Sequence, residues 1–209
     1  MTRQTAAAAA ILLAAALAPR AHAQTAPADS LPARAGTWAF EAGVGTNTFS
    51  GGSVNVGALR FLGARSALTF NLFGGYSSQT RDSTAQLGGG TTRSAQLGAN
   101  VGVRRYGPAR GGLAGFGGVG ATGSYWRFSS GQGQTQTRVG GYGELGAAYL
   151  VARRLTINAS TALTVARVGG RSESLIFTGI DQPPTPVSAR LRGWEVGAGG
   201  VRLSATLYF

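Results

Sequence analysis

Apolar and polar residues alternate along most of the chain from residue 36 onward. Residues 68–72 read Leu-Thr-Phe-Asn-Leu, and residues 155–165 and 201–209 continue the same two-residue period. This period places successive side chains on opposite faces of a β-strand, whereas an amphipathic helix repeats every three or four residues. The pattern therefore predicts an all-β protein.

Short and long connections alternate between the predicted strands. Tight turns are expected at 63–66, 107–111 and 152–154, and longer polar segments at 50–53, 79–93, 128–137 and 168–190. Most of the strands between them reach the length of about 9 to 11 residues that crosses a bilayer at a tilt. We therefore predict an eight-stranded antiparallel up-and-down transmembrane β-barrel over 36–209, with strands at 36–49, 54–62, 67–78, 94–106, 112–127, 138–151, 155–167 and 191–209.

The residues between the apolar positions are small or polar, among them Gly43, Gly98, Gly102 and Asn100. A soluble barrel would carry a dense set of charged residues on its exterior. With 19 Arg, no Lys and 7 acidic residues, the chain lacks a charged surface of the usual density. The 35 glycines among its 209 residues are a far larger share than the usual value of about 7%. Small residues suit the inside of a narrow barrel, so we assign this face to the lumen. Gly199 and Gly200 predict a bulge that shifts the facing of the last strand, and the glycine-rich strand 112–127 does not define its own register.

Aromatic residues gather near the strand ends, which is typical of side chains at the two membrane interfaces. The aromatics assigned to these interfaces are Trp38, Phe40, Tyr76, Tyr106, Tyr149 and Trp194.

The N-terminus has the three parts of a secretory signal peptide. Arg3 precedes a run of Ala, Ile and Leu over 6–18, and Ala21 and Ala23 occupy the −3 and −1 positions of a cleavage site. We expect 1–23 to be the signal peptide and 24–35 to be a flexible lead-in, because that segment combines two prolines with small polar residues.

Composition removes most catalytic chemistry. The chain has no Cys, and its single histidine, His22, lies in the predicted signal peptide. Thiolate or imidazole metal sites, serine triads and histidine bases are therefore not expected. The glycines of 115–120 match a dinucleotide-binding pattern, but neither the required helix nor the acidic residue follows them. We expect no enzyme activity, cofactor or metal.

Charged residues on the predicted lumen face fall into two pairs. Counted from the short turns, Glu41 and Arg104 lie low on their strands, whereas Glu144 and Arg202 lie about seven residues up from that end, in strands that rise about 3.3 Å per residue. We therefore expect the ion pairs Glu41–Arg104 and Glu144–Arg202, which would plug the lumen. Glu41, Glu144 and Glu195 are expected at different heights, which argues against an acid-pair hydrolase.

The C-terminal residues alternate and finish in an aromatic: Leu203, Ala205, Leu207, Tyr208 and Phe209. Together with the predicted export and the eight-strand pattern, this ending resembles the small OmpA/OmpX-like family of bacterial outer-membrane β-barrel domains. The resemblance implies localisation in the outer membrane, and recognition of these residues by the barrel-assembly machinery.

The net charge of +12 prompts a search for anionic partners. Neither a basic helix nor an aromatic-interleaved platform for nucleic acid is present, so we expect no nucleic acid. Arginines in the long connections suit the phosphates of outer-membrane lipids and lipopolysaccharide, and we expect a monomer. The arginines concerned are Arg81, Arg93, Arg171, Arg190 and Arg192.

The sequence thus favours a non-enzymatic barrel with a structural or surface-interaction role. Two alternatives stay open. A narrow porin-like channel for small solutes would conduct ions, and a soluble periplasmic lipocalin-like carrier would need an apolar interior cavity.

Overall fold

The computed structural model describes residues 31–47, 51–81, 90–129, 133–176 and 185–209. Nine strands make up nearly all of this part of the chain. They are β1 (Trp38–Asn47), β2 (Gly51–Phe61), β3 (Ser66–Arg81), β4 (Gly90–Tyr106), β5 (Leu113–Ser129), β6 (Gly133–Ala152), β7 (Leu155–Ile176), β8 (Thr185–Ala198) and β9 (Arg202–Tyr208).

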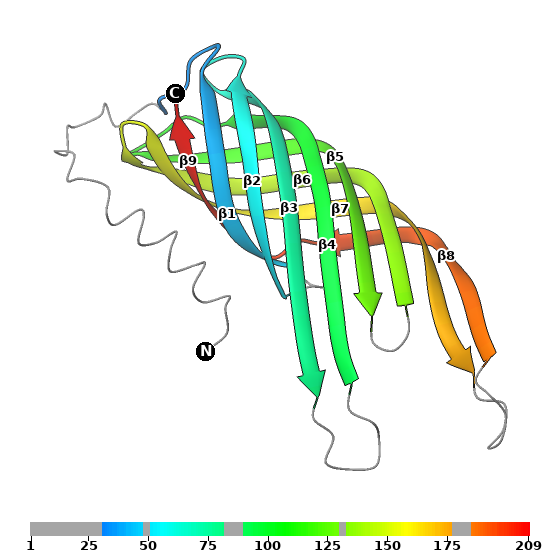
Figure 1. Cartoon of the computed structure of the whole chain (residues 1–209). Helices are drawn as coiled ribbons and strands as arrows, with labels where there is room; N and C mark the ends of the chain where they lie inside the picture. Colours follow the sequence, from blue (N-terminus) through cyan, green and yellow to red (C-terminus); the bar gives the residue numbers. More distant parts are fainter. Residues whose placement is uncertain (1–30, 48–50, 82–89, 130–132, 177–184) are drawn as a thin grey trace.

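The strands form a closed antiparallel barrel (Figure 1). Each of β1 to β7 pairs with its neighbour along the chain, and β1 closes the barrel by pairing with β9. β9 pairs with the first part of β7 and β8 with the rest, so β8 and β9 together make the eighth strand. The predicted eight-stranded antiparallel barrel is confirmed.

The break between β8 and β9 changes which residues face outward. Trp194 and Val196 face outward on β8, whereas Leu203 and Leu207 face outward on β9. Within the break, the Gly199 amide donates to the Ala162 carbonyl at 2.5 Å. The predicted shift of facing at Gly199 and Gly200 is therefore confirmed.

The exterior of the barrel is apolar and much of its interior is polar, which is the reverse of the arrangement in a soluble protein. Among the large apolar side chains that are exposed on the exterior are Val54, Val56, Leu68, Phe70, Leu72, Leu97, Val101, Val119, Val139, Leu145, Ile157, Leu163, Val196 and Leu203. Buried polar and charged side chains face the lumen, and these are Glu41, Asn55, Thr69, Asn71, Ser94, Arg104, Glu144, Thr156, Asn158, Ser160, Ser204 and Thr206.

Glycines on the lumen face let large side chains lie across the narrow interior. A Cβ on Gly102 would come within 2.6 Å of the Tyr142 hydroxyl, and one on Gly120 within 2.8 Å of the Tyr142 ring. Both positions must therefore stay without a side chain for Tyr142 to keep its place.

Several segments predicted as long loops are instead strand extensions. Pairing between β3 and β4 continues to Arg81 opposite Gly90, and pairing between β7 and β8 continues to Ile176 opposite Thr185. The predicted loops 79–93, 128–137 and 168–190 are therefore much shorter. Backbone hydrogen bonds continue the ladders where side chains are no longer apolar, so the hydropathy pattern underestimated the lengths of the strands.

The two ends of the barrel differ in their connections. We call the end with these long strand extensions the hairpin end, and the end with turns 62–65, 107–112 and 153–154 the turn end.

Candidate functional site

A buried arginine lies at the centre of the lumen. The Arg104 Nη1 on β4 donates to Glu41 Oε2 of β1 at 2.8 Å, and its Nη2 donates to Glu144 Oε2 of β6 at 3.0 Å. The side chains of Arg104 and Glu41 are 1% and 0% exposed. One guanidinium therefore holds two carboxylates inside the barrel.

A second arginine completes the network. Arg202 Nη2 lies 3.2 Å from Glu41 Oε1 and also pairs with Glu144 Oε1. The two predicted pairs, Glu41–Arg104 and Glu144–Arg202, are thus both present, and each arginine also contacts the other pair's glutamate. We call these residues the lumen network. Its charges balance, which suits ions buried away from water.

The strand register explains the contact between Arg104 and Glu144. Glu144 lies opposite Gly118 of β5, which lies opposite Arg104 of β4, so the two charged side chains share one row of the wall. Gly118 carries no side chain between them. Glu41 is reached across the lumen instead, from the facing side of the barrel.

The expectation that Glu41, Glu144 and Glu195 lie at separate heights is wrong for the first two, because both contact Arg104. Counting residues from the turns ignored the stagger between tilted strands. Glu195 does lie apart, and it pairs with Arg138 at 3.3 Å.

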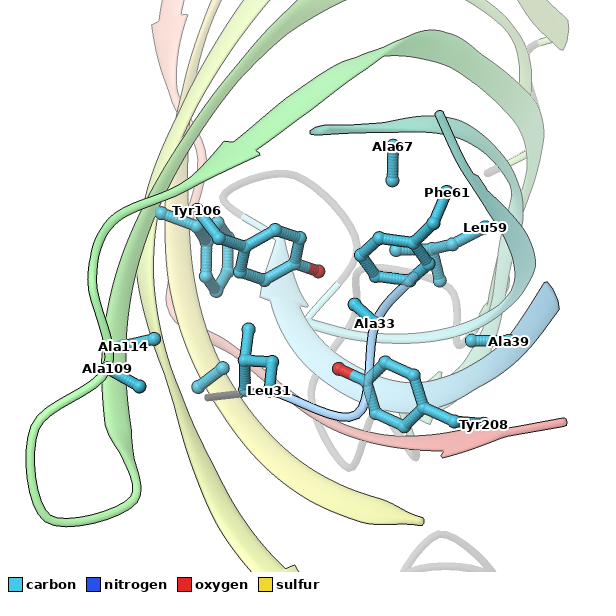
Figure 2. Close-up of a cluster of buried hydrophobic side chains, with 12 residues drawn as sticks. Leu31, Ala33, Ala39, Leu59, Phe61, Ala67, Tyr106, Ala109, Ala114 and Tyr208 are labelled. Carbon is cyan, nitrogen blue, oxygen red and sulfur yellow. The ribbon is translucent and has the colours of Figure 1, made fainter. Parts of the chain in front are cut away.

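Aromatic side chains fill the lumen on the turn-end side of the network (Figure 2). Phe61 packs between Tyr106 and Tyr208, with ring centroids 5.8 and 5.7 Å away, and Tyr106 packs on Phe116 at 5.5 Å. The Arg104 guanidinium lies 4.5 Å from the centroid of the Phe116 ring. We call these four rings the aromatic layer. They separate the lumen network from the turn end.

The interface prediction for Tyr106 is wrong. Tyr106 is 2% exposed and faces the lumen, and Tyr208 of the C-terminal pattern is equally buried there. Their hydroxyls have polar neighbours inside: Arg104 Nη1 donates to the Tyr106 hydroxyl at 3.4 Å, and the Tyr208 hydroxyl lies 3.4 Å from Thr156 Oγ1. Tyr106 lies two positions from Arg104 and Tyr208 lies two positions from Thr206, and both of these residues face the lumen. The two-residue period therefore indicates the facing of the tyrosines, whereas their position near a strand end does not.

The other predicted interface aromatics are exposed on the exterior: Trp38, Phe40, Tyr76, Tyr149 and Trp194. Leu203, Leu207 and Phe209 of the C-terminal pattern are exposed as well, and Ala205 is half-buried. The cleavage residues Ala21 and Ala23 lie outside the described residues.

The segment before β1 packs into the turn end of the lumen. Leu31 and Ala33 are 9% and 4% exposed and belong to the same buried cluster as the aromatic layer. The Gly36 amide, with φ at +86°, donates to the Phe61 carbonyl at 2.8 Å. Sequence composition gave no sign of this packing, since Pro32 and its small neighbours resemble a linker.

A polar chamber lies on the hairpin-end side of the network. Its volume is ≈ 220 Å³, and its walls include Asn55, Asn71, Asn100, Tyr142 and the Arg138–Glu195 pair. Glu144 and Arg202 line the same chamber. From the hairpin end inward, the lumen thus contains a polar chamber, the lumen network and the aromatic layer.

Within the described part of the chain, no group of three or more His, Cys, Asp or Glu side chains could hold a metal ion. The same residues contain no helix long and apolar enough to cross a membrane.

Comparison with known proteins identifies the fold. No family model matches the sequence, and no curated protein sequence is similar to it. The structure is similar to that of the outer membrane protein OprG from Pseudomonas aeruginosa, with a TM-score of 0.53 and 12% identity over 83% of this chain and 98% of that one. It is also similar to a major outer membrane protein from Thermus thermophilus, with a TM-score of 0.52 and 12% identity over 82% of this chain and 99% of that one. The chain therefore has the fold of these outer-membrane barrels, while the specific resemblance to OmpA/OmpX-like domains stays a prediction.

Proposed function

We propose that this protein is an integral bacterial outer-membrane β-barrel with a closed lumen. In this proposal it has no enzyme activity and acts through its exterior and its extracellular loops, in a structural or surface-interaction role. The hairpin end faces the cell exterior, because outer-membrane barrels place their short turns in the periplasm and their longer connections outside.

The apolar exterior supports the membrane location. Soluble monomers rarely expose a contiguous apolar patch beyond a few hundred Å², whereas here large apolar side chains are exposed on every strand. Closure into a barrel satisfies the backbone groups of the wall, as lipid requires. A lipocalin-like carrier would need an open apolar cavity. In this barrel charged and amide side chains line the polar chamber, and the aromatic layer fills the apolar part of the lumen.

The closed lumen is the observation that carries the proposal. Glu41 and Arg104 block the interior with almost completely buried side chains. The aromatic layer adds a second barrier, and Leu31 with Ala33 packs against it. An ion crossing the barrel would have to displace both barriers, so we favour a closed barrel over a porin-like channel.

The same contacts argue against enzyme chemistry in the lumen. A carboxyl group that acts as a general acid or base must be able to exchange its proton with a substrate. Glu41 and Glu144 are instead both held by Arg104 and Arg202.

Two partners belong to this proposal. The barrel-assembly machinery would recognise the exposed C-terminal residues Leu203, Leu207 and Phe209, and lipopolysaccharide would surround the hairpin end. The barrel itself closes within one chain, which suits a monomer.

Conductance across a planar bilayer tests the closed lumen. We expect the wild-type protein to produce no single-channel steps, and the double variant Arg104→Ala with Tyr106→Ala to produce them, since it opens both barriers. Glu173→Gln, on the exterior, is the matched control and should stay silent. Regular steps from the wild-type protein would favour the channel, and a silent double variant that still inserts would show that these residues do not form the barrier.

A further inference from the structure

Arginines gather on the outer face of the barrel near the hairpin end of β7 and β8. Arg167 and Arg171 are exposed on β7, on the face that carries Leu163 and Val165. Arg190 and Arg192 are exposed on β8, on the face that carries Trp194 and Val196. We call these four arginines the arginine cluster.

Along β7 and β8, the residues of this face change from apolar to charged toward the hairpin end. Val165 lies opposite Val196, and Arg167 lies opposite Trp194. Further toward the hairpin end, Gly169 lies opposite Arg192 and Arg171 lies opposite Arg190. The cluster thus begins where the apolar band ends, which is where lipid headgroups meet a membrane barrel.

Arg171 and Arg190 form a like-charge pair. Directly opposed residues of antiparallel strands have Cβ atoms about 4.5–5.5 Å apart, and like charges at that spacing destabilise the sheet. Arg192 lies two positions from Arg190, or about 7 Å along the strand. Gly169, opposite Arg192, has open space in place of a side chain. Three guanidinium groups can therefore converge on one anion.

The carboxylates of the described residues do not pair with the cluster. Among the described residues, no ion pair joins any of its four arginines to an acidic side chain. Glu173 is exposed on the same face, but its side chain lies toward β6 and away from β8. Its Oε2 is 3.6 Å from the position that a Cβ on Gly133 of β6 would occupy, and β7 separates β6 from β8. Within the described part of the chain, the cluster thus keeps its positive charge.

A strand two positions away in the barrel wall adds a further cation to this row. Arg127 of β5 is exposed and lies opposite Thr135 of β6, which lies opposite Arg171. Two strand spacings place the Arg127 backbone about 10 Å from that of Arg171. Exposed arginines at one level therefore lie on β5, β7 and β8.

We propose that the arginine cluster binds the phosphate groups of a phosphorylated glycolipid of the outer leaflet. Guanidinium groups bind phosphate through paired hydrogen bonds, and the exposed Trp194 and Val196 below them offer an apolar surface to the acyl chains. This inference rests on the proposed outer-membrane location and assigns the residues that would bind the lipid partner named there. A phosphate there relieves the repulsion between Arg171 and Arg190.

Native mass spectrometry of the full chain, extracted from membranes and exchanged into neutral detergent, tests the site. The probes are bis-phosphorylated lipid A, the same lipid with both phosphates removed, and inorganic phosphate as competitor. We expect lipid A to bind at least about tenfold more tightly than its dephosphorylated form, a difference of about 1.4 kcal/mol. Inorganic phosphate should displace it only in large excess.

Arg171→Gln with Arg190→Gln should reduce lipid A affinity at least about tenfold. The matched control is Arg60→Gln with Arg105→Gln, which removes the same charge from exposed positions nearer the turn end and should leave the affinity within about twofold. Equal binding by the two double variants, or equal binding of the dephosphorylated lipid, would overturn the proposal. Displacement by phosphate at concentrations similar to that of the lipid would also overturn it, in favour of a simple anion site.

The single variant Arg192→Gln keeps the test decisive if the double variant does not fold, because it should weaken lipid A binding in the same direction. The heat-dependent gel mobility of each preparation reports barrel formation separately. A folded barrel from the outer membrane without phosphate preference would defeat this inference alone, and a soluble protein would defeat the proposed function as well.

Discussion

Arg104 and Glu41 meet across the lumen, with Nη1 of the arginine 2.8 Å from Oε2 of the glutamate and both side chains almost completely buried. They belong to strands that do not pair with each other, since β4 pairs with β3 and β5, and β1 pairs with β2 and β9. Their contact therefore crosses the barrel instead of following its wall. It joins opposite sides of the barrel and blocks the interior.

Removing the arginine at the centre of this network should destabilise the barrel more than removing one of its carboxylates. Arg104→Met leaves Glu41 and Glu144 with only Arg202, and loss of one partner from a buried ion pair costs about 3–5 kcal/mol. Glu41→Gln should cost less, because each arginine keeps Glu144. Urea unfolding in lipid vesicles, followed by tryptophan fluorescence, measures both changes. The exposed Glu173→Gln is the control, and an Arg104→Met variant as stable as this control would refute the assigned role.

Glycine positions on the two faces should respond differently to the same added methyl group. Gly120→Ala places a Cβ 2.6 Å from the Gly102 Cα and 2.8 Å from the Tyr142 ring, whereas nothing lies within 4 Å of the Cβ position at Gly143. We expect Gly120→Ala to lower stability by about 1–3 kcal/mol, the usual cost of overpacking, and Gly143→Ala to have little effect. The same unfolding assay compares them. Equal stability of the two variants would contradict the tight lumen packing around Tyr142.

The segment before β1 should loosen when its buried leucine becomes polar. Leu31 is 9% exposed, and burial of a leucine is worth about 1.5–3 kcal/mol. We expect Leu31→Gln to increase the rate of trypsin cleavage after the exposed Arg34 in the folded barrel. Leu62→Gln makes the same chemical change at a side chain that is 55% exposed and serves as control. An unchanged cleavage rate for Leu31→Gln would mean that this packing does not hold the segment in place.

Alternation of residue types was sufficient to predict the barrel and the facing of most side chains. The two-residue period placed Glu41, Arg104, Glu144 and Arg202 inside, and the Gly199–Gly200 pair indicated the change of facing before β9. Both follow from local chain geometry, because successive side chains of a strand point to opposite faces.

Features that depend on the stagger between strands could not be predicted in this way. The row that joins Arg104 to Glu144 passes through Gly118, in a glycine-rich strand whose own pattern defines no register. The contact between Arg104 and Glu41 depends on the closed barrel as a whole. Tyr106 lies near a strand end but faces the lumen, so its position along the strand does not indicate its facing. Lipid-facing and lumen-facing aromatics can lie at the same height, and facing alone separates them.

Heat-dependent gel mobility of the protein from separated cell fractions tests the central claim, a stable barrel in the outer membrane, most directly. Folded outer-membrane barrels keep their compact shape in detergent until they are boiled, so the boiled and unboiled samples should migrate differently. We predict that the protein is found in the outer-membrane fraction and that its band shifts on boiling. A protein found in the soluble fraction, with a band unchanged by boiling, would contradict the account.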